Sequence, residues 1–197
     1  MKIIPSSYRV NFESTVNWLG MRPCARKRGG LGTRLPWDNE WIIESLSDST
    51  IYMAFYTVAR HVKEGEASKV LSELASKVID SNGSDEDSLR KLLSFYDYVF
   101  LGEGQPPLIL PEVARRAREE FSYWYPPVDQ RHSGIDLIGN HLSFFIAHHA
   151  AIFPREMWPR SITLNNFVIR NGQKMSRSLG NVLPPQGGRG QLSARYG

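Results

Sequence analysis

The sequence has one cysteine, Cys24, among its 197 residues, and it has no long uninterrupted apolar run. A single cysteine excludes an internal disulfide and gives no sign of secretion. The first ten residues, MKIIPSSYRV, contain too short an apolar run for a signal peptide. The most apolar stretch, residues 137–153, is interrupted by Asn140 and three histidines, which excludes a membrane span. These absences predict a soluble, cytoplasmic protein with no membrane partner.

Several catalytic signatures are also missing. The basic, glycine-rich segment 22–37 lacks the spacing of a P-loop or of a dinucleotide-binding fingerprint. No Gly-x-Ser-x-Gly string supports a serine hydrolase. His148 and His149 are adjacent, so on a helix they point apart, and no cysteine or spaced carboxylate joins His141 and His149 on a shared face. We therefore expect no metal site.

The overall composition is that of an ordinary globular protein. Hydrophobic residues make up 41% of the chain and charged residues 22%, and this length can bury a core. The net charge of +4 permits a polyanionic partner without requiring one.

The spacing of apolar residues predicts an N-terminal helix and a later pair of helices. The first helix is capped by Ser6 or Ser7 and ends at Gly20, and its apolar stripe is Tyr8, Phe12, Val16 and Leu19. The polar segment 45–50 is predicted to separate two helical pieces, of which the second is a buried helix over 51–62.

The middle of the chain predicts three more helices. Two amphipathic helices, around 70–78 and 89–96, are joined by a polar turn at 81–88. A breaker follows at 102–107, and Pro111 fits the first turn of a helix that runs toward Trp124. Residues 161–170 are rich in β-forming residues.

Residues 123–153 form the first stretch that points to chemistry. Two prolines, a short extended segment, a Ser-Gly turn and a long apolar stretch predict a strand–loop–helix unit. In a parallel sheet such a loop lies at the ligand-binding edge. Asp136, near the start of the helix, can cap that helix or accept a hydrogen bond from a ribose hydroxyl.

The second such stretch is residues 167–182, FVIRNGQKMSRSLGNV. The dipeptide Asn171-Gly172 between β-prone arms predicts a hairpin. The loop after it offers two cations and two hydroxyls suited to phosphate oxygens, namely Lys174, Arg177, Ser176 and Ser178. A basic surface turn is the alternative for a bare Lys-x-x-Arg pattern.

The complete string makes the phosphate interpretation more specific. Residues 174–178, Lys-Met-Ser-Arg-Ser, followed by Gly180-Asn181, resemble the Lys-Met-Ser-Lys-Ser signature of class I aminoacyl-tRNA synthetases. Residues 30–38 and 43–54, GLGTRLPWD and IESLSDSTIYMA, are similar to archaeal and eukaryotic leucyl-tRNA synthetases. Arg177 departs from the usual lysine of that signature.

The resemblance implies an α/β fold, the second half of a Rossmann-like class I catalytic domain. It assigns residues 1–183 to this partial domain, with a helical insertion around 63–124, and leaves an irregular, disordered tail at 184–197. It implies ATP-dependent ligation of leucine to tRNA(Leu) through leucyl-adenylate, with Mg²⁺ accompanying ATP.

The resemblance also implies roles for individual residues. Lys174 and Arg177 are the implied catalytic residues, acting on the triphosphate. The implied ATP-binding residues are Gly134, Asp136, His141, Lys174, Met175, Ser176, Arg177 and Ser178. Gly134 and Asp136 match the Gly-x-Asp element that holds the ribose of the adenylate in this family, and His141 matches a histidine near the nucleotide.

One family signature does not occur in this sequence, the His-Ile-Gly-His-type string of the first half of the domain. The chain alone is therefore expected to be inactive, and a complementary chain carrying that half is an expected partner. Two alternatives stay open. One is a non-catalytic RNA-binding or assembly partner, suggested by the basic segments 22–34 and 115–118. The other is an inert remnant of a synthetase gene, suggested by the unusual tail.

Overall fold

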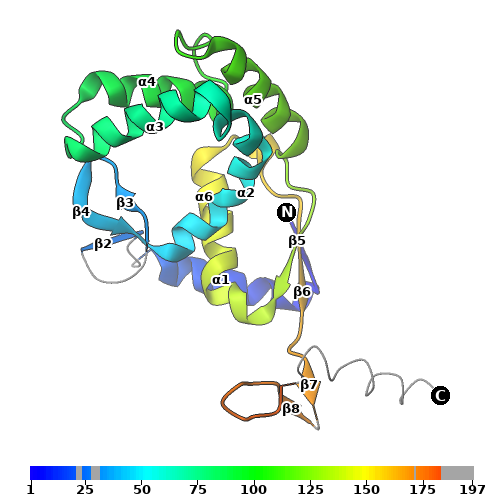
Figure 1. The fold of residues 1–197 in the computed structure, drawn as a ribbon. Helices are drawn as coiled ribbons and strands as arrows, with labels where there is room; N and C mark the ends of the chain where they lie inside the picture. Colours follow the sequence, from blue (N-terminus) through cyan, green and yellow to red (C-terminus); the bar gives the residue numbers. More distant parts are fainter. Residues whose placement is uncertain (21–23, 28–31, 171, 183–197) are drawn as a thin grey trace. The chain divides into compact units, whose positions relative to one another are not determined.

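The computed structural model describes residues 1–20, 24–27, 32–170 and 172–182 (Figure 1). The predicted tail at 184–197, Asn171 of the predicted hairpin turn and part of the basic segment 22–37 lie outside the described residues. The chain divides into two compact units, Met1–Leu164 and Asn165–Gly197, which we describe separately. The assignment of residues 1–183 to one partial domain stays a prediction.

A three-stranded sheet in the first unit confirms the predicted α/β class. Strand β1 (Lys2–Ile4) pairs in parallel with β6 (Ser161–Asn165), and Ile3 lies opposite Ile162. Strand β5 (Arg131–Gly134) completes the order β1-β6-β5. Parallel neighbours so distant in sequence need crossover connections, and helices supply them here.

The sheet packs against two helical segments. The 3₁₀ turn η1 (Ser6–Tyr8) leads into α1 (Arg9–Leu19), and the π-helical turn η4 (Ile138–Leu142) leads into α6 (Ser143–Ile152). A small core joins these elements to the sheet through Ile3, Phe12, Ile138, Leu142 and Ile162.

The N-terminal helix ends at Gly20 as predicted, but two details of its prediction are wrong. No serine side chain caps it, because the turn η1 occupies the predicted capping positions. Of the predicted stripe only Phe12 is buried, and Val16 is 53% exposed. Phe12 is therefore the one side chain of this short helix that is buried.

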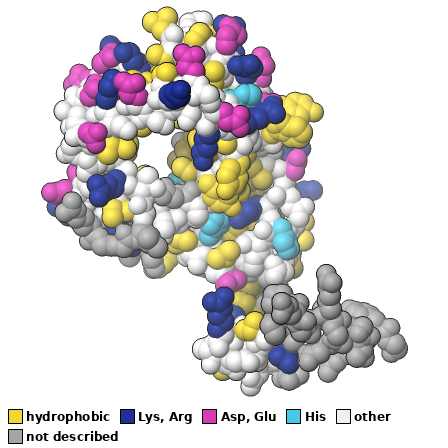
Figure 2. All heavy atoms as spheres, viewed as in Figure 1, with side chains coloured by type: hydrophobic (Ala, Val, Ile, Leu, Met, Phe, Trp, Pro, Cys, Tyr) yellow, Lys and Arg dark blue, Asp and Glu magenta, His cyan; other side chains and the backbone are white. Residues whose placement is uncertain are grey.

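A second, larger core is formed by helices. It lies among α2 (Ser45–Val62), α3 (Gly65–Asp80), α4 (Glu86–Tyr96), the π-helical turn η2 (Asp97–Leu101) and α5 (Pro111–Trp124). The two predicted amphipathic helices are confirmed as α3 and α4, and Pro111 occupies the first turn of α5. Figure 2 shows acidic and basic side chains interspersed over α3 and α4, where ion pairs such as Lys77–Glu73 form.

The prediction around segment 45–50 is wrong. The residues before it form strand β4 (Asp38–Ile43), which pairs with β2 (Ala25–Lys27) and β3 (Arg34–Leu35) in a separate antiparallel sheet. Segment 45–50 is itself the start of α2, because the Glu44 carboxylate caps the helix by accepting from the Leu46 amide. The hydroxyls of Ser49 and Thr50 bond back to carbonyls three residues earlier, so they do not break the helix.

Residues after α6 return to the parallel sheet through the 3₁₀ turn η5 (Arg155–Met157). In the second unit, β7 (Ile169–Arg170) and β8 (Gln173–Lys174) pair antiparallel, which confirms the two arms of the predicted hairpin. Among helices built from the described residues, none is both long and apolar enough to cross a membrane.

Candidate functional site

The side chain of Asn181 bonds the loop after β8 at two points. Its carboxamide oxygen accepts from the Ser176 amide at 2.8 Å, and its carboxamide nitrogen donates to the Lys174 carbonyl at 3.1 Å. On the other side, the Met175 amide donates to the Val168 carbonyl at 3.1 Å. These three bonds fix the backbone from Lys174 to Ser176.

A compact turn completes the loop. The amides of Leu179 and Gly180 donate to the carbonyls of Ser176 and Arg177, and the hydroxyls of Ser176 and Ser178 lie 2.6 Å apart. Gly180 has a φ of 62°, in the left-handed region that favours glycine. The Gly-Asn pair that follows the signature therefore has a structural reason, since Gly180 ends the turn and Asn181 clamps it.

The two cations of the loop are exposed, and the described residues give neither of them an ion-pair partner. The Lys174 ammonium lies 3.7 Å from the centroid of the Phe167 ring. Residues 165–182 contain three cations, Arg170, Lys174 and Arg177, and no carboxylate side chain. The loop therefore presents uncompensated positive charge.

Gly134 and Asp136 lie together in the first unit. Gly134 ends β5 and Asp136 lies in the following 3₁₀ turn η3 (Ile135–Leu137). A Cβ added to Gly134 would lie 2.5 Å from the Asp136 Oδ1 atom, so the carboxylate folds back against the end of the strand and would have to shift if residue 134 carried a side chain. The Gly-x-Asp spacing thus places a carboxylate beside the end of β5.

His141, the third predicted nucleoside contact, is buried in the same unit. Its Nε2 lies 3.1 Å from the Ser49 carbonyl in α2, and because a carbonyl only accepts, Nε2 carries the proton. Burial lowers the pKa of His141, so the ring is neutral near pH 7. The buried Nδ1 atom has no hydrogen-bond partner among the described residues. The His141 ring is thus fixed to α2 through Nε2, and its Nδ1 atom is an acceptor without a donor among the described residues.

The other predicted ATP-binding residues, Lys174 to Ser178, belong to the second unit. The structure brings these five residues together in one loop, and it brings Gly134 and Asp136 together at the end of β5. Their joint action on one ligand stays a prediction.

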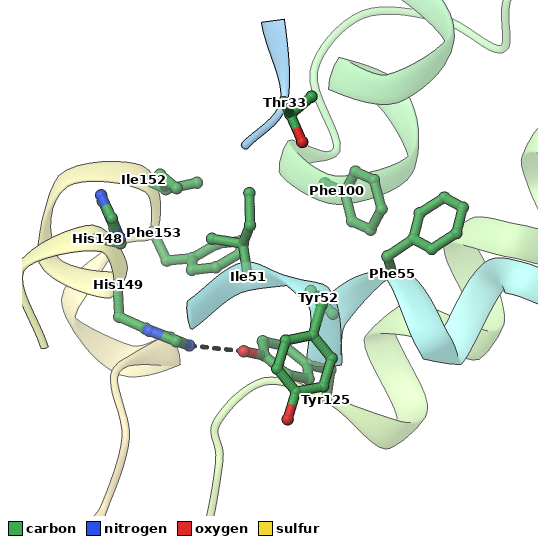
Figure 3. Close-up of a pocket in the computed structure, with 11 residues that line it drawn as sticks. Thr33, Ile51, Tyr52, Phe55, Phe100, Tyr125, His148, His149, Ile152 and Phe153 are labelled. Atoms are coloured by element: carbon green, nitrogen blue, oxygen red, sulfur yellow. Dashed lines mark hydrogen bonds between the residues drawn. The ribbon is translucent and has the colours of Figure 1, made fainter. Parts of the chain in front are cut away.

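An apolar pocket of about 650 Å³ in the first unit was not predicted (Figure 3). Its aliphatic and aromatic lining comes mainly from α2 and the end of α6, and includes Ile51, Tyr52, Phe55, Phe100, Ile152 and Phe153. Its polar lining includes Thr33, Tyr125, His148 and His149. The sequence signal for it was the apolar run 137–153, which alone does not indicate what packs against it.

The neighbouring histidines of this pocket have different partners. His149 Nδ1 lies 2.7 Å from the Phe145 carbonyl and must donate, so Nε2 accepts from the Tyr125 hydroxyl at 2.8 Å. His148 Nδ1 lies 2.6 Å from the hydroxyl of Thr50. Burial lowers the pKa of both imidazoles and raises the pKa of Tyr125 to about 12. Both rings are neutral hydrogen-bonding groups that join α6 to its neighbours.

Comparison with known proteins gives three informative relatives, and no protein-family model matches this chain. The chain is 51% identical over 189 residues to the leucine–tRNA ligase of Staphylothermus marinus, which covers 93% of this chain and 17% of that protein. It is 49% identical over 190 residues to leucine–tRNA ligase 2 of Sulfolobus acidocaldarius, covering 93% and 18%. The ligase of Methanothrix thermoacetophila is 48% identical over 189 residues, covering 93% and 18%.

Similarity at this level over almost the whole chain identifies it as part of an aminoacyl-tRNA synthetase. Within this class, the resemblance to leucyl-tRNA synthetases is confirmed, because all three relatives are leucine–tRNA ligases. The chain spans less than a fifth of the length of these relatives.

Proposed function

We propose that this chain takes part in ATP-dependent ligation of leucine to tRNA(Leu), as the portion of the catalytic domain that carries the triphosphate-binding loop. The observation that supports this proposal is the loop itself. Its backbone is fixed by Asn181, while the side chains of Lys174 and Arg177 stay exposed and unpaired with any carboxylate of the described residues. A fixed backbone that presents cations without a carboxylate partner suits an anionic ligand.

In the proposed reaction, a carboxylate oxygen of leucine attacks the α-phosphorus of ATP. The bond from that phosphorus to the bridging oxygen breaks, and negative charge develops on the leaving pyrophosphate. Lys174 supplies a compact charge and Arg177 a planar set of donors to stabilise it. Ser176 and Ser178 bond to each other and shape the turn between these cations. Catalysis then depends on orientation and charge, without a covalent bond to the protein.

Gly134, Asp136 and His141 are proposed to hold the nucleoside. The Asp136 carboxylate, folded back against Gly134, can accept hydrogen bonds from ribose hydroxyls. His141 has already committed its Nε2 proton to the Ser49 carbonyl, so it can contribute to a ligand only as an acceptor. Mg²⁺ would enter with ATP as part of the substrate. The described residues contain no group of three potential metal-ligating His, Cys, Asp or Glu side chains.

The alternative of an RNA-binding partner receives less support from α5. Arg115 pairs with Glu112, and Arg118 donates to the Val99 carbonyl at 3.1 Å. Two of the three arginines on this helix are therefore engaged within the chain. The first half of the domain, supplied by a complementary chain or by the rest of a longer protein, remains part of the proposal.

A chimeric enzyme tests this function. The chain replaces the matching segment of the Staphylothermus marinus ligase, and leucine-dependent pyrophosphate–ATP exchange is measured. We expect Lys174→Ala to lower the exchange rate on the order of a hundredfold, the cost of losing one donor aimed at developing charge. Lys63→Ala is the matched control, because Lys63 is also an exposed lysine beside a phenylalanine but lies in the first unit.

Two outcomes would count against the proposal. One is an undiminished exchange rate in the Lys174→Ala chimera. The other is an equal loss with Lys63→Ala, which would indicate a general defect of folding. The isolated chain should give no exchange above a blank reaction.

A further inference from the structure

The Lys174 side chain has a specific neighbour, the ring of Phe167. Lys174 pairs with Ile169 across the β7–β8 hairpin, and Phe167 precedes Ile169 by two residues. Residues two apart on an extended strand share a face, so Phe167 is the diagonal neighbour of Lys174. The ammonium lies 3.7 Å from the ring centroid, well within the range of a cation–π contact.

Phe167 has no other evident packing role among the described residues. It is 38% exposed, and neither hydrophobic core includes it. Residues 165–182 contain no Asp or Glu that could hold the lysine instead. The ring is therefore the group that determines where the Lys174 ammonium rests.

Other lysines of the chain provide a scale for this contact. Lys63 lies 5.3 Å from the Phe55 centroid, and Lys27 lies 5.7 Å from the Trp41 ring. Both are more distant than Lys174 is from Phe167, and both belong to the first unit. The closest of these cation–π contacts thus involves the lysine of the signature loop.

We propose that Phe167 is a positioning residue for Lys174, whose ring holds the ammonium until a polyphosphate draws it away. This inference rests on the proposed function, in which Lys174 binds the triphosphate. A cation–π contact at an exposed site is weak, and charge-assisted hydrogen bonds to phosphate oxygens are stronger. The Lys174 ammonium therefore leaves the ring when a polyphosphate binds.

The proposal predicts that loss of the Phe167 ring increases the affinity for polyphosphate, whereas a purely structural role predicts a decrease. When polyphosphate binds, the Lys174 ammonium must leave the Phe167 ring, and the lost contact reduces the net binding free energy. Removal of the ring should therefore tighten binding. The energy of an exposed cation–π contact corresponds to a gain of about two- to fivefold in affinity. If Phe167 merely stabilised the hairpin, its removal would weaken binding instead.

The resting contact can be observed directly by NMR on the full chain. Protons above an aromatic face resonate upfield, so the ε-methylene signal of Lys174 should be shifted upfield in the absence of ligand. Phe167→Leu should abolish this shift and Phe167→Tyr should retain it. Saturating inorganic tripolyphosphate should move the Lys174 signal to the ordinary lysine position and leave the signal of Lys63 unchanged.

Affinity for tripolyphosphate gives the second measurement, by titration calorimetry on the full chain. We expect Phe167→Leu to bind about two- to fivefold more tightly than the original chain, and Phe55→Leu to bind as the original does. In a Lys174→Ala background, Phe167→Leu should have no effect. This cycle isolates the coupling between the ring and the ammonium.

The proposal is overturned if the Lys174 signal is unshifted without ligand, if tripolyphosphate fails to bind or to move that signal, or if Phe167→Leu weakens binding. The pyrophosphate–ATP exchange assay on the chimera tests the proposed function independently of these two measurements. A chimera that tolerates Lys174→Ala would reject the catalytic role, while a ligand-sensitive ring shift in the chain would still establish the contact between Phe167 and Lys174.

Discussion

The two units of the chain differ in charge and in what holds them together. The first, Met1–Leu164, contains 20 acidic and 19 basic residues, and it encloses fully buried side chains such as Phe95, Phe121 and Phe145. The second, Asn165–Gly197, contains five cations and no carboxylate side chain, and no residue in its described part is buried. The whole excess of positive charge of this chain therefore lies in its last 33 residues.

This difference separates the stability of the chain from the ligand binding that we propose for its loop. Burial of apolar surface accounts for the fold of the first unit, whereas hydrogen bonds and one cation–π contact shape the loop of the second. Mutations in the core should then change unfolding without changing the loop, and mutations in the loop should do the reverse.

The largest effect is expected from Phe121→Ala. The Phe121 ring is fully buried, lies edge-to-face with Phe100 at 5.0 Å, and stacks with Tyr125 and Phe153. Its removal leaves a cavity, so the free energy of unfolding should fall by about 3–5 kcal/mol in a denaturant titration. Tyr123→Ala is the control, because Tyr123 lies on the same helix but is 78% exposed. Similar losses for both variants would contradict the assignment of this core.

A second effect, on the order of 2 kcal/mol, should appear at high pH. Burial raises the pKa of Tyr125 to about 12, above the value of about 10 in an unfolded chain. Between these values the folded state keeps a proton that the unfolded state loses, so stability falls as the pH rises from about 10 to about 12. The measurement is the free energy of unfolding against pH.

Tyr125→Phe separates this effect from other titrations. The variant lacks the hydroxyl, so its stability should fall less steeply over the same pH range. It also leaves the His149 Nε2 atom without its donor, which should lower stability at neutral pH. Parallel pH profiles for the two proteins would show that the Tyr125 hydroxyl is not buried.

Much of the fold was predictable because its elements are strongly patterned. Helices α3 and α4 follow from apolar spacing, and Pro111 marks the start of α5. The start of α2 was not predictable from composition, because the hydroxyls of Ser49 and Thr50 bond back within the helix while Glu44 supplies the cap. Local preference there was overridden by hydrogen bonding that a sequence pattern does not reveal.

The signature predicted which residues belong to the candidate site, but not how they are arranged in space. The cations, hydroxyls and glycine of the loop are explicit in the sequence, and their suitability for phosphate follows from their chemistry. The contact of Lys174 with Phe167 depends on hairpin register, and the closing of the loop by Asn181 depends on the turn that follows β8. The burial of His141 against Ser49 likewise depends on tertiary packing.

A smaller effect, confined to the loop, is expected from Asn181→Ala. The variant loses the bonds to the Ser176 amide and the Lys174 carbonyl, each worth about 0.5–1.5 kcal/mol. Hydrogen exchange at the Ser176 amide should become about two- to tenfold faster, while the core unfolds as before. Asn165→Ala is the control, since among the described residues that exposed side chain has one hydrogen bond, to the adjacent carbonyl of Asn166. Unchanged exchange at Ser176 would show that Asn181 does not clamp the loop.

The smallest effect is expected from Arg177→Lys, which restores the usual residue of the signature. Arg177 is exposed, and its backbone carbonyl accepts from the Gly180 amide whatever the side chain is. The free energy of unfolding should therefore change by less than about 0.5 kcal/mol. Lysine keeps the charge but replaces the planar fork with a point charge, so tripolyphosphate affinity should stay within about threefold, whereas Arg177→Gln should lose more because it removes the charge. Equal affinities for arginine, lysine and glutamine would show that position 177 does not face the phosphates, and the catalytic role would then rest on Lys174 alone.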